Sequence, residues 1–166
     1  MTQNSSIKEK VLHPEQNAKA APAPVNEEAK AAVGQDNCAD ELDERVCMAL
    51  RAASEKKAQE MVVLDLREVA SFTDYFLITS GTNVRQVQAI ADAVVEQLKK
   101  QGTKAARVEG YNTAEWVLVD YGDFILHVFE DKARKFYDLE RLWRDAKRVA
   151  LPSDLAGAEG SLRTQS

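Results

Sequence analysis

The chain has 166 residues, 45% of them hydrophobic, and its 22 Lys and Arg against 27 Asp and Glu give a net charge of −5. This length suits one domain with a substantial core plus some tail. The acidic balance argues against binding of bare nucleic acid by charge alone and favours basic partners. Because we find neither a run of roughly 18–20 apolar residues nor a signal-peptide core, we expect a cytoplasmic protein without a membrane span.

The sequence contains two cysteines, Cys38 and Cys47, which are too few for a disulfide-rich secreted fold. We therefore expect a reduced, cytosolic setting for both. Cys47 has no CxxC or HxxxH partner, so we predict no zinc site. The sequence also lacks a GxGxxG or Walker motif, so we predict no cofactor.

Three segments differ in composition. Residues 1–40 hold eight Ala, three Pro and no aromatic residue, which predicts a disordered extension. Residues 41–149 carry the periodic patterns and form the predicted domain. Residues 150–166 lack periodicity and are predicted to be a flexible C-terminal tail.

The first predicted element is a helix that ends near Ala58, with Asp40 or Asp43 as its N-cap. Two apolar runs of strand length follow it, at residues 61–66 and 75–80. Such runs are typical of strands that are buried on both faces of a sheet.

The next predicted helix starts at Asn83, with Gln86 three residues on as a capping-box partner, and Gly102 supplies its C-terminal cap. Strands are predicted after it, at residues 107–109, 116–120 and 124–129.

Tyr121 and Gly122 join the last two of these strands, which leaves room only for a tight hairpin. Apolar residues at helical spacing then mark a closing helix: Phe136, Leu139, Trp143 and Ala146. The order α-β-β-α-β-β-β-α predicts a compact α/β single domain, in which helices flank a mixed sheet of about five strands.

Few residues in the predicted domain suit catalysis. His127 alternates with Ile125 and Phe129 on one strand face, where a structural histidine is the favoured interpretation over a general base. Ser80-Gly81-Thr82 lies between a strand and a helix, so its backbone N–H groups could hold a phosphate. A Gly required by the backbone is the simpler explanation.

Charge is unevenly distributed near the C-terminal end of the predicted domain. Residues 107–131 hold one basic residue against six acidic ones, whereas residues 132–148 hold seven basic residues against three acidic ones. This predicts an acidic hairpin followed by a basic helix, either as two solvated faces or as a bipolar binding surface. Trp116 in the acidic strand is then either a core residue or an interface anchor.

Four blocks of sequence are similar to those of the Iojap family, whose bacterial members are the RsfS ribosomal silencing factors. These blocks read FTDYFLITSGTN (72–83), RQVQAIAD (85–92), VEGYNTAEWVLVDYGDFILHVF (108–129) and RKFYDLERLW (134–143). With Asp65-Leu66 the resemblance covers about residues 43–148 in order.

The resemblance implies a nucleotidyltransferase-like fold without the metal-binding carboxylates, and therefore no enzymatic activity. The sequence agrees, because no Asp-x-Asp follows the Ser80-Gly81-Thr82 turn on any predicted strand. Family members bind the large ribosomal subunit through ribosomal protein uL-fourteen. They thereby block joining of the small subunit and repress translation when nutrients are short.

The resemblance also implies a binding site for the ribosomal protein, without a catalytic or metal site. Trp116 is the expected anchor, and the hairpin carboxylates are expected to pair with basic side chains. The expected site residues are Trp116, Asp120, Gly122, Asp123, His127, Glu130, Arg134 and Tyr137. The last four could instead hold the strand against the last helix.

Several alternatives stay open. A large-subunit assembly factor would make the same contacts at a different time. A nucleotidyltransferase-type enzyme would need Asp65 and a second carboxylate that the sequence does not reveal. The basic last helix could contact nearby ribosomal RNA, and a homodimer could form through an exposed sheet edge or apolar patch.

Overall fold

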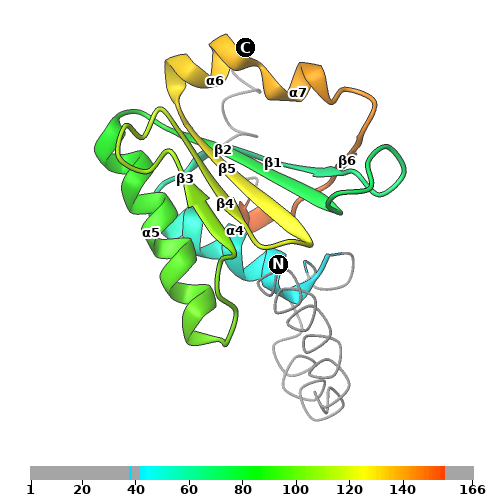
Figure 1. Ribbon diagram of the computed structural model, residues 1–166, viewed down its shortest axis with the longest axis horizontal. Coiled ribbons are helices and arrows are strands. Elements are labelled where there is room, and N and C mark those ends of the chain that lie inside the picture. The colour runs from blue at the N-terminus through cyan, green and yellow to red at the C-terminus, as the bar shows by residue number, and fades with distance from the viewer. Residues whose placement is uncertain (1–37, 39–41, 156–166) are drawn as a thin grey trace, which may run out of the picture. The chain divides into compact units, whose positions relative to one another are not determined.

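A computed structural model describes Cys38 and residues 42–155, and within them a six-stranded sheet in the order β3-β4-β5-β2-β1-β6 carries helices on both faces (Figure 1). The strands are β1 (Gln59–Asp65), β2 (Tyr75–Gly81), β3 (Arg107–Glu109), β4 (Trp116–Asp120), β5 (Phe124–Glu130) and β6 (Lys147–Val149). The helices are α4 (Glu44–Glu55), α5 (Val84–Lys100), α6 (Asp131–Tyr137) and α7 (Leu139–Leu142). In these described residues, no helix has the length and apolar character that crossing a membrane requires.

The sheet is mixed, as predicted. Strands β2 and β5 pair in parallel, from Tyr75 opposite Phe124 to Gly81 opposite Glu130, and the other neighbouring strands pair antiparallel. Every residue of β2 is buried, which agrees with the apolar run from Tyr75 to Ile78 and extends to the polar residues Thr79 and Ser80.

Each face of the sheet packs against its own layer of helices (Figure 1). Leu77 of β2 points to the layer formed by α4 and α5, whereas its neighbour Ile78 points to the layer formed by α6 and α7. This alternation is the period-2 pattern of a strand between two cores.

Local signals fixed several helix ends correctly. Asp43 rather than Asp40 caps α4, because its side chain accepts the backbone N–H of Arg45. The Asn83 side chain accepts the N–H of Gln86 at 2.8 Å, as predicted for the start of α5. The reciprocal bond differs in one detail: Gln86 Oε1 accepts the N–H of Thr82 at 2.7 Å, not that of Asn83.

The predicted closing helix is wrong in its C-terminal half. Asp138 adopts a left-handed conformation, with φ 48°, and separates α6 from α7. The chain then forms β6, in which Val149 pairs with Val63 and Lys147 with Asp65. This sixth strand was missed because its three residues carry two charges, which are typical of a protected sheet edge.

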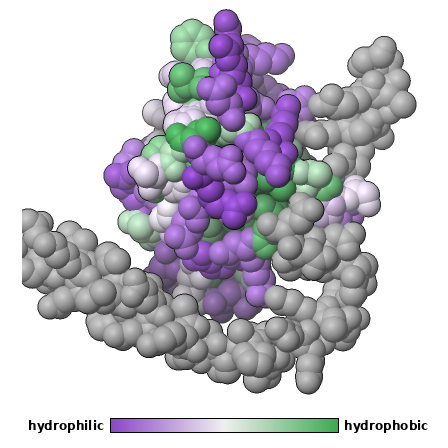
Figure 2. Space-filling model, turned by 90° about the vertical axis from the view of Figure 1, so that its right-hand side faces the viewer, coloured by the Kyte–Doolittle hydropathy of each residue, from purple (hydrophilic) through white to green (hydrophobic). Residues whose placement is uncertain are grey.

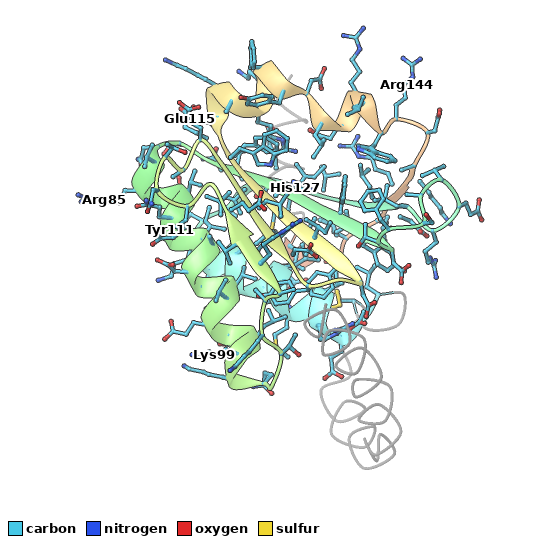
Figure 3. All side chains as sticks on the ribbon, in the orientation of Figure 1. Arg85, Lys99, Tyr111, Glu115, His127 and Arg144 are labelled. Carbon is cyan, nitrogen blue, oxygen red and sulfur yellow. A yellow bond between two sulfur atoms is a disulfide. The ribbon has the colours of Figure 1, made fainter. Side chains whose placement is uncertain are left out.

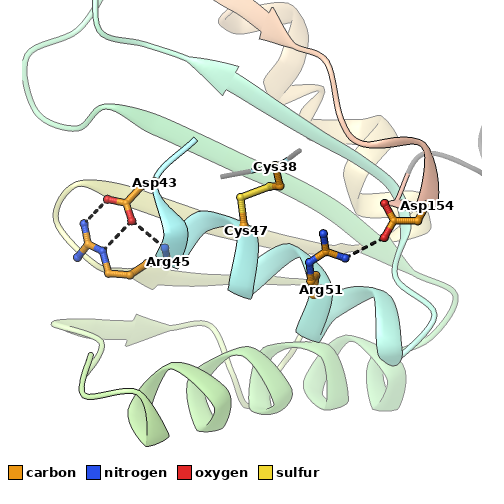
Figure 4. The surroundings of a disulfide bond; sticks show 6 residues. All are labelled: Cys38, Asp43, Arg45, Cys47, Arg51 and Asp154. Carbon is orange, nitrogen blue, oxygen red and sulfur yellow. Dashed lines mark hydrogen bonds and ion pairs between the residues drawn. A yellow bond between two sulfur atoms is a disulfide. The ribbon is translucent and has the colours of Figure 1, made fainter. Parts of the chain in front are cut away.

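The expectation of reduced cysteines is also wrong for this structure, because Cys38 and Cys47 form a disulfide (Figure 4). A backbone hydrogen bond joins Leu42 N–H to Cys38 O (3.0 Å) just before α4. The Cα atoms of Cys38 and Cys47 are 5.9 Å apart, within the range that a disulfide can bridge.

The C-terminal segment differs from its prediction up to residue 155. Leu151 and Leu155 pack against the core beside α4, and Asp154 forms an ion pair with Arg51 at 2.8 Å. The i, i+4 spacing of the two leucines was the overlooked signal. The predictions for 1–37, 39–41 and 156–166 lie outside the described residues.

Candidate protein-binding surface

Trp116 lies where the helices stop covering the sheet. In β4, Val117 and Val119 are buried towards α5, which leaves Trp116 and Leu118 half-buried on the opposite face. The Trp116 ring packs against Phe129 and Tyr137, each with ring centroids 4.8 Å away. The large aromatic ring is therefore held in place and still partly open to solvent.

His127 holds the polar edge of this ring. Trp116 Nε1–H donates a hydrogen bond to His127 Nδ1 at 3.1 Å, which places the imidazole proton on Nε2. Burial lowers the pKa of His127 to about 3, so the imidazole is neutral at physiological pH. In Figure 3 His127 lies in the middle of the sheet beneath α6 and α7, so it cannot itself touch a partner.

A shallow groove of about 250 Å³ runs beside Trp116 and is lined by Glu109, Gly110, Trp116 and Leu118. Gly110 has φ 78°, and any side chain there would collide with the carbonyl oxygen of Trp116. The chain thus needs glycine at this position to pass close to β4.

Three further residues extend the apolar surface across α6 and α7. Tyr137, Phe136 and Leu142 are 46%, 79% and 74% exposed. Phe136 was expected to mark the closing helix, and it does lie in α6, but its side chain is exposed to solvent. We call Trp116, Leu118, Phe136, Tyr137 and Leu142 together the β4–α6 surface.

Basic side chains border this surface. Phe136, Tyr137 and Leu142 line a hollow of about 660 Å³ together with Lys135, Asp138, Arg141, Arg144 and Asp145. Arg144 points away from the sheet in Figure 3. Figure 2 shows the side of the molecule with β6, which is largely hydrophilic and has separate hydrophobic patches in its upper and middle parts.

The hairpin residues Asp120, Gly122 and Asp123 shape the turn that ends β4. Asp120 accepts the N–H of Gly122 at 2.8 Å, and Gly122 has φ 89°. Asp123 accepts a hydrogen bond from the Arg45 guanidinium at 2.8 Å, with its side chain 65% exposed. Both carboxylates therefore have partners inside the domain and also face solvent.

Glu130 and Arg134 have internal roles. Glu130 caps α6, because its side chain accepts the N–H groups of Lys132 and Ala133. Arg134 is only 8% exposed and makes two hydrogen bonds to Glu140, at 3.2 and 3.0 Å. It also donates to Ser80 Oγ at 3.2 Å, so it joins α6 and α7 to the sheet.

The predicted acidic face is divided between the two ends of the hairpin. Asp120 and Asp123 lie at its turn, whereas Glu115 lies at the far end, where its carbonyl accepts the N–H of Glu130. The predicted basic helix does not present all of its charges to solvent either, because Arg134 and Arg148 both form ion pairs with Glu140. The acidic and basic residues therefore do not form two uninterrupted faces, and the choice between solvated charges and a binding surface stays a prediction.

The residues considered for enzymatic chemistry have partners within the protein. Asp65 pairs with Arg67 at 2.8 Å, and hydrogen bonding from Arg67 holds the pKa of Asp65 below its usual value. Gln86 already occupies the N–H of Thr82 in the turn considered for phosphate binding. Within residues 42–155 and Cys38, no cluster of three or more His, Cys, Asp or Glu residues could hold a metal ion.

Residues 39–165 match the family model "Ribosomal silencing factor during starvation". The chain belongs to the RsfS family. It is 42% identical to the ribosomal silencing factor RsfS of Halalkalibacterium halodurans, over 63% of this chain and 89% of that protein. It is 41% identical to RsfS of Bacillus subtilis, over 60% of this chain and 84% of the relative.

A mitochondrial relative and a solved bacterial structure are also similar to this chain. A mouse protein named "Mitochondrial assembly of ribosomal large subunit protein 1" is 30% identical, over 54% of this chain and 40% of its own length. A crystal structure from Chromobacterium violaceum matches with a TM-score of 0.60 and 35% identity, over 62% of this chain and 86% of that one. The mixed α/β fold is thus that of RsfS-family structures.

Proposed function

We propose that this protein binds the large ribosomal subunit through ribosomal protein uL-fourteen and sterically prevents the small subunit from joining. The single observation that carries this proposal is the partly exposed Trp116, whose ring is held in place by His127 and Tyr137. Preorganised aromatic side chains of this kind are typical anchors of protein interfaces.

The β4–α6 surface supplies the contact area. Exposed apolar patches on soluble proteins commonly mark interaction sites, and this one combines the rings of Trp116, Phe136 and Tyr137 with two leucines, Leu118 and Leu142. Asp123 is exposed and Asp120 is partly exposed at the hairpin turn, where both can orient a basic ribosomal protein. Arg141 and Arg144 border the same surface and would face nearby ribosomal RNA phosphates.

The mechanism requires occupancy and no chemical step, so we propose that the protein is not an enzyme. A repressor of this kind, acting in the cytoplasm when nutrients are limiting, works by covering a surface that the small subunit needs. A homodimer that used the β4–α6 surface would compete with the ribosome for the same residues.

A second candidate is a factor for large-subunit assembly. It is favoured by the name of the mouse relative, which refers to assembly of the large ribosomal subunit. The two functions predict the same binding and differ in whether mature subunits are prevented from joining.

Co-sedimentation with separated subunits and light scattering of subunit joining test both candidates. We expect wild-type protein to bind only the large subunit and to suppress joining, and Trp116→Ala to lose at least tenfold in affinity. Phe72→Ala is the matched control, since Phe72 is an exposed aromatic residue outside the β4–α6 surface. Binding without suppression would favour the assembly factor, and equal losses in both variants would contradict the assigned surface.

A further inference from the structure

The disulfide between Cys38 and Cys47 lies apart from the proposed binding surface. It attaches the start of the domain to α4, which covers the sheet face opposite α6 and α7 (Figures 1 and 4). Both cysteines are buried in the apolar cluster that also contains Leu42, Val46 and Leu50. The surroundings are apolar enough to pack two thiols as readily as a disulfide.

The disulfide fixes the residues that begin α4. Leu42 N–H donates to Cys38 O, and Asp43 next in the chain caps the helix. Arg45 then joins Asp43 to Asp123 at the hairpin tip, with distances of 2.8 Å to both carboxylates. Its guanidinium also lies 5.4 Å from the centroid of the Phe124 ring.

A short path therefore connects the disulfide to the hairpin. Cys47 lies in the same first turns of α4 as Arg45, and Arg45 is the side chain that reaches across to β4 and β5. Reduction of the disulfide therefore removes a covalent restraint from the N-terminal end of α4, where Asp43 and Arg45 lie.

We propose that Cys38 and Cys47 form a reversible thiol–disulfide exchange site, which a small thiol of the glutathione type opens and closes. In the opening reaction, a thiolate attacks one sulfur, the Cys38–Cys47 bond breaks, and the released thiolate takes up a proton. A second thiol resolves the mixed disulfide. The protein then holds two thiols, and two molecules of the small thiol have been oxidised to their disulfide.

The position of the pair favours reversibility. Its cysteines are nine residues apart in sequence, so that after reduction they remain close enough to pair again. Both sulfurs are buried, so attack requires a local opening beside the N-terminal end of α4. Reduction then loosens the start of α4 and, through Arg45, the hairpin tip.

The test uses the full chain equilibrated in glutathione buffers of increasing reducing strength, followed by acid quench, alkylation and mass spectrometry. We expect the disulfide form to convert to the dithiol within this range, without unfolding. Reduction should lower the thermal midpoint by roughly 5–10 °C. It should also speed hydrogen exchange several-fold at residues 44–50 and 122–124.

Two variants serve as controls. Cys38→Ser/Cys47→Ser should behave as the reduced protein and should not respond to glutathione. Arg45→Met keeps both cysteines and should give fast exchange at 122–124 in either redox state. None of these readouts involves a ribosome, so the proposal stands or falls independently of the proposed function.

Two results would overturn the proposal. One is alkylation of both cysteines even in oxidising buffer, because the pair would then not form. The other is a disulfide that persists in the folded protein at every glutathione ratio, because the bond would then be permanent. Unchanged exchange at 122–124 on reduction would overturn the link through Arg45.

Discussion

The pair of Arg134 and Glu140 offers a sharp test of how α6 and α7 are held on the sheet. Arg134 is almost fully buried and its guanidinium binds Glu140, Ser80 and the carbonyl oxygen of Gln59. The Glu140 side chain is 27% exposed and is also 3.6 Å from Arg148. Each partner is therefore left in a different environment when the other is removed.

Replacing Glu140 leaves a buried guanidinium without its counter-charge. Breaking a fully buried pair in this way costs about 3–5 kcal/mol. Because Ser80 and Gln59 still accept from Arg134, we expect Glu140→Leu to lower the free energy of unfolding by about 3 kcal/mol. Arg134→Met should cost about 2 kcal/mol, since Glu140 keeps Arg148 and some solvent.

The double variant Arg134→Met/Glu140→Leu leaves no buried charge unpaired at this site. We expect it to cost only about 2–3 kcal/mol, well below the sum of the single variants, which is a coupling of about 2–3 kcal/mol. Urea unfolding at pH 7, followed by tryptophan fluorescence and circular dichroism, measures all three values. Additive costs within about 0.5 kcal/mol would refute the assignment of a buried, coupled pair.

The same variants decide whether Arg134 touches a partner. If its role is to position α6 and α7, the double variant should bind the large subunit nearly as well as wild type. Lost binding by a stable double variant would return Arg134 to the contact residues expected from the family resemblance.

Three further predictions follow from single positions. His127 has a pKa of about 3 in the folded protein, against about 6.5 in the unfolded chain. The stability that it contributes is therefore present above pH 6.5 and decreases as the pH falls from 6.5 towards 3. In this window, the stability difference between wild type and His127→Gln should shrink by about 1 kcal/mol for each pH unit, and a constant difference would contradict a buried neutral imidazole. Gly110→Ala should lower the free energy of unfolding by about 1–3 kcal/mol, because Gly110 has a positive φ and an added Cβ would collide with the Trp116 carbonyl oxygen. Gly102 also has a positive φ but has free space around it, so Gly102→Ala should cost less in the same chemical denaturation assay. Asp138→Gly should raise the thermal midpoint by a few degrees, since glycine adopts the left-handed conformation of Asp138 without strain; a lower midpoint would show that the Asp138 side chain contributes more than its backbone costs.

Sequence patterns predicted the parts of the fold that depend on near neighbours. The caps at Asp43 and Asn83 and the hairpin turn at Gly122 all involve residues a few positions apart. Their hydrogen bonds are set by local conformation, so composition and spacing identify them.

The missed features all depend on distant partners. Strand β6 exists because it pairs with β1, some eighty residues earlier, and its own sequence resembles a charged loop. Leu155 reaches a core built chiefly from α4, α5 and the sheet. In the sequence Arg134 is one of several charges in a basic run. Only the fold places Ser80 and Glu140 beside it.

Exposure divides the eight residues expected at the binding site into groups that the sequence could not separate. Trp116 and Tyr137 present rings to solvent, and Asp120 and Asp123 present carboxylates from the hairpin that Gly122 shapes. His127, Glu130 and Arg134 instead hold the Trp116 ring, cap α6 and fix α7. A rigid binding surface needs its supports as much as its contacts, so both kinds of residue belong to the proposed site. Binding and stability measurements separate the two groups. A variant of a contact residue, such as Trp116→Ala, should lose more ribosome affinity than stability. A variant of a supporting residue should lose both together, and a second substitution that restores its stability should then restore binding.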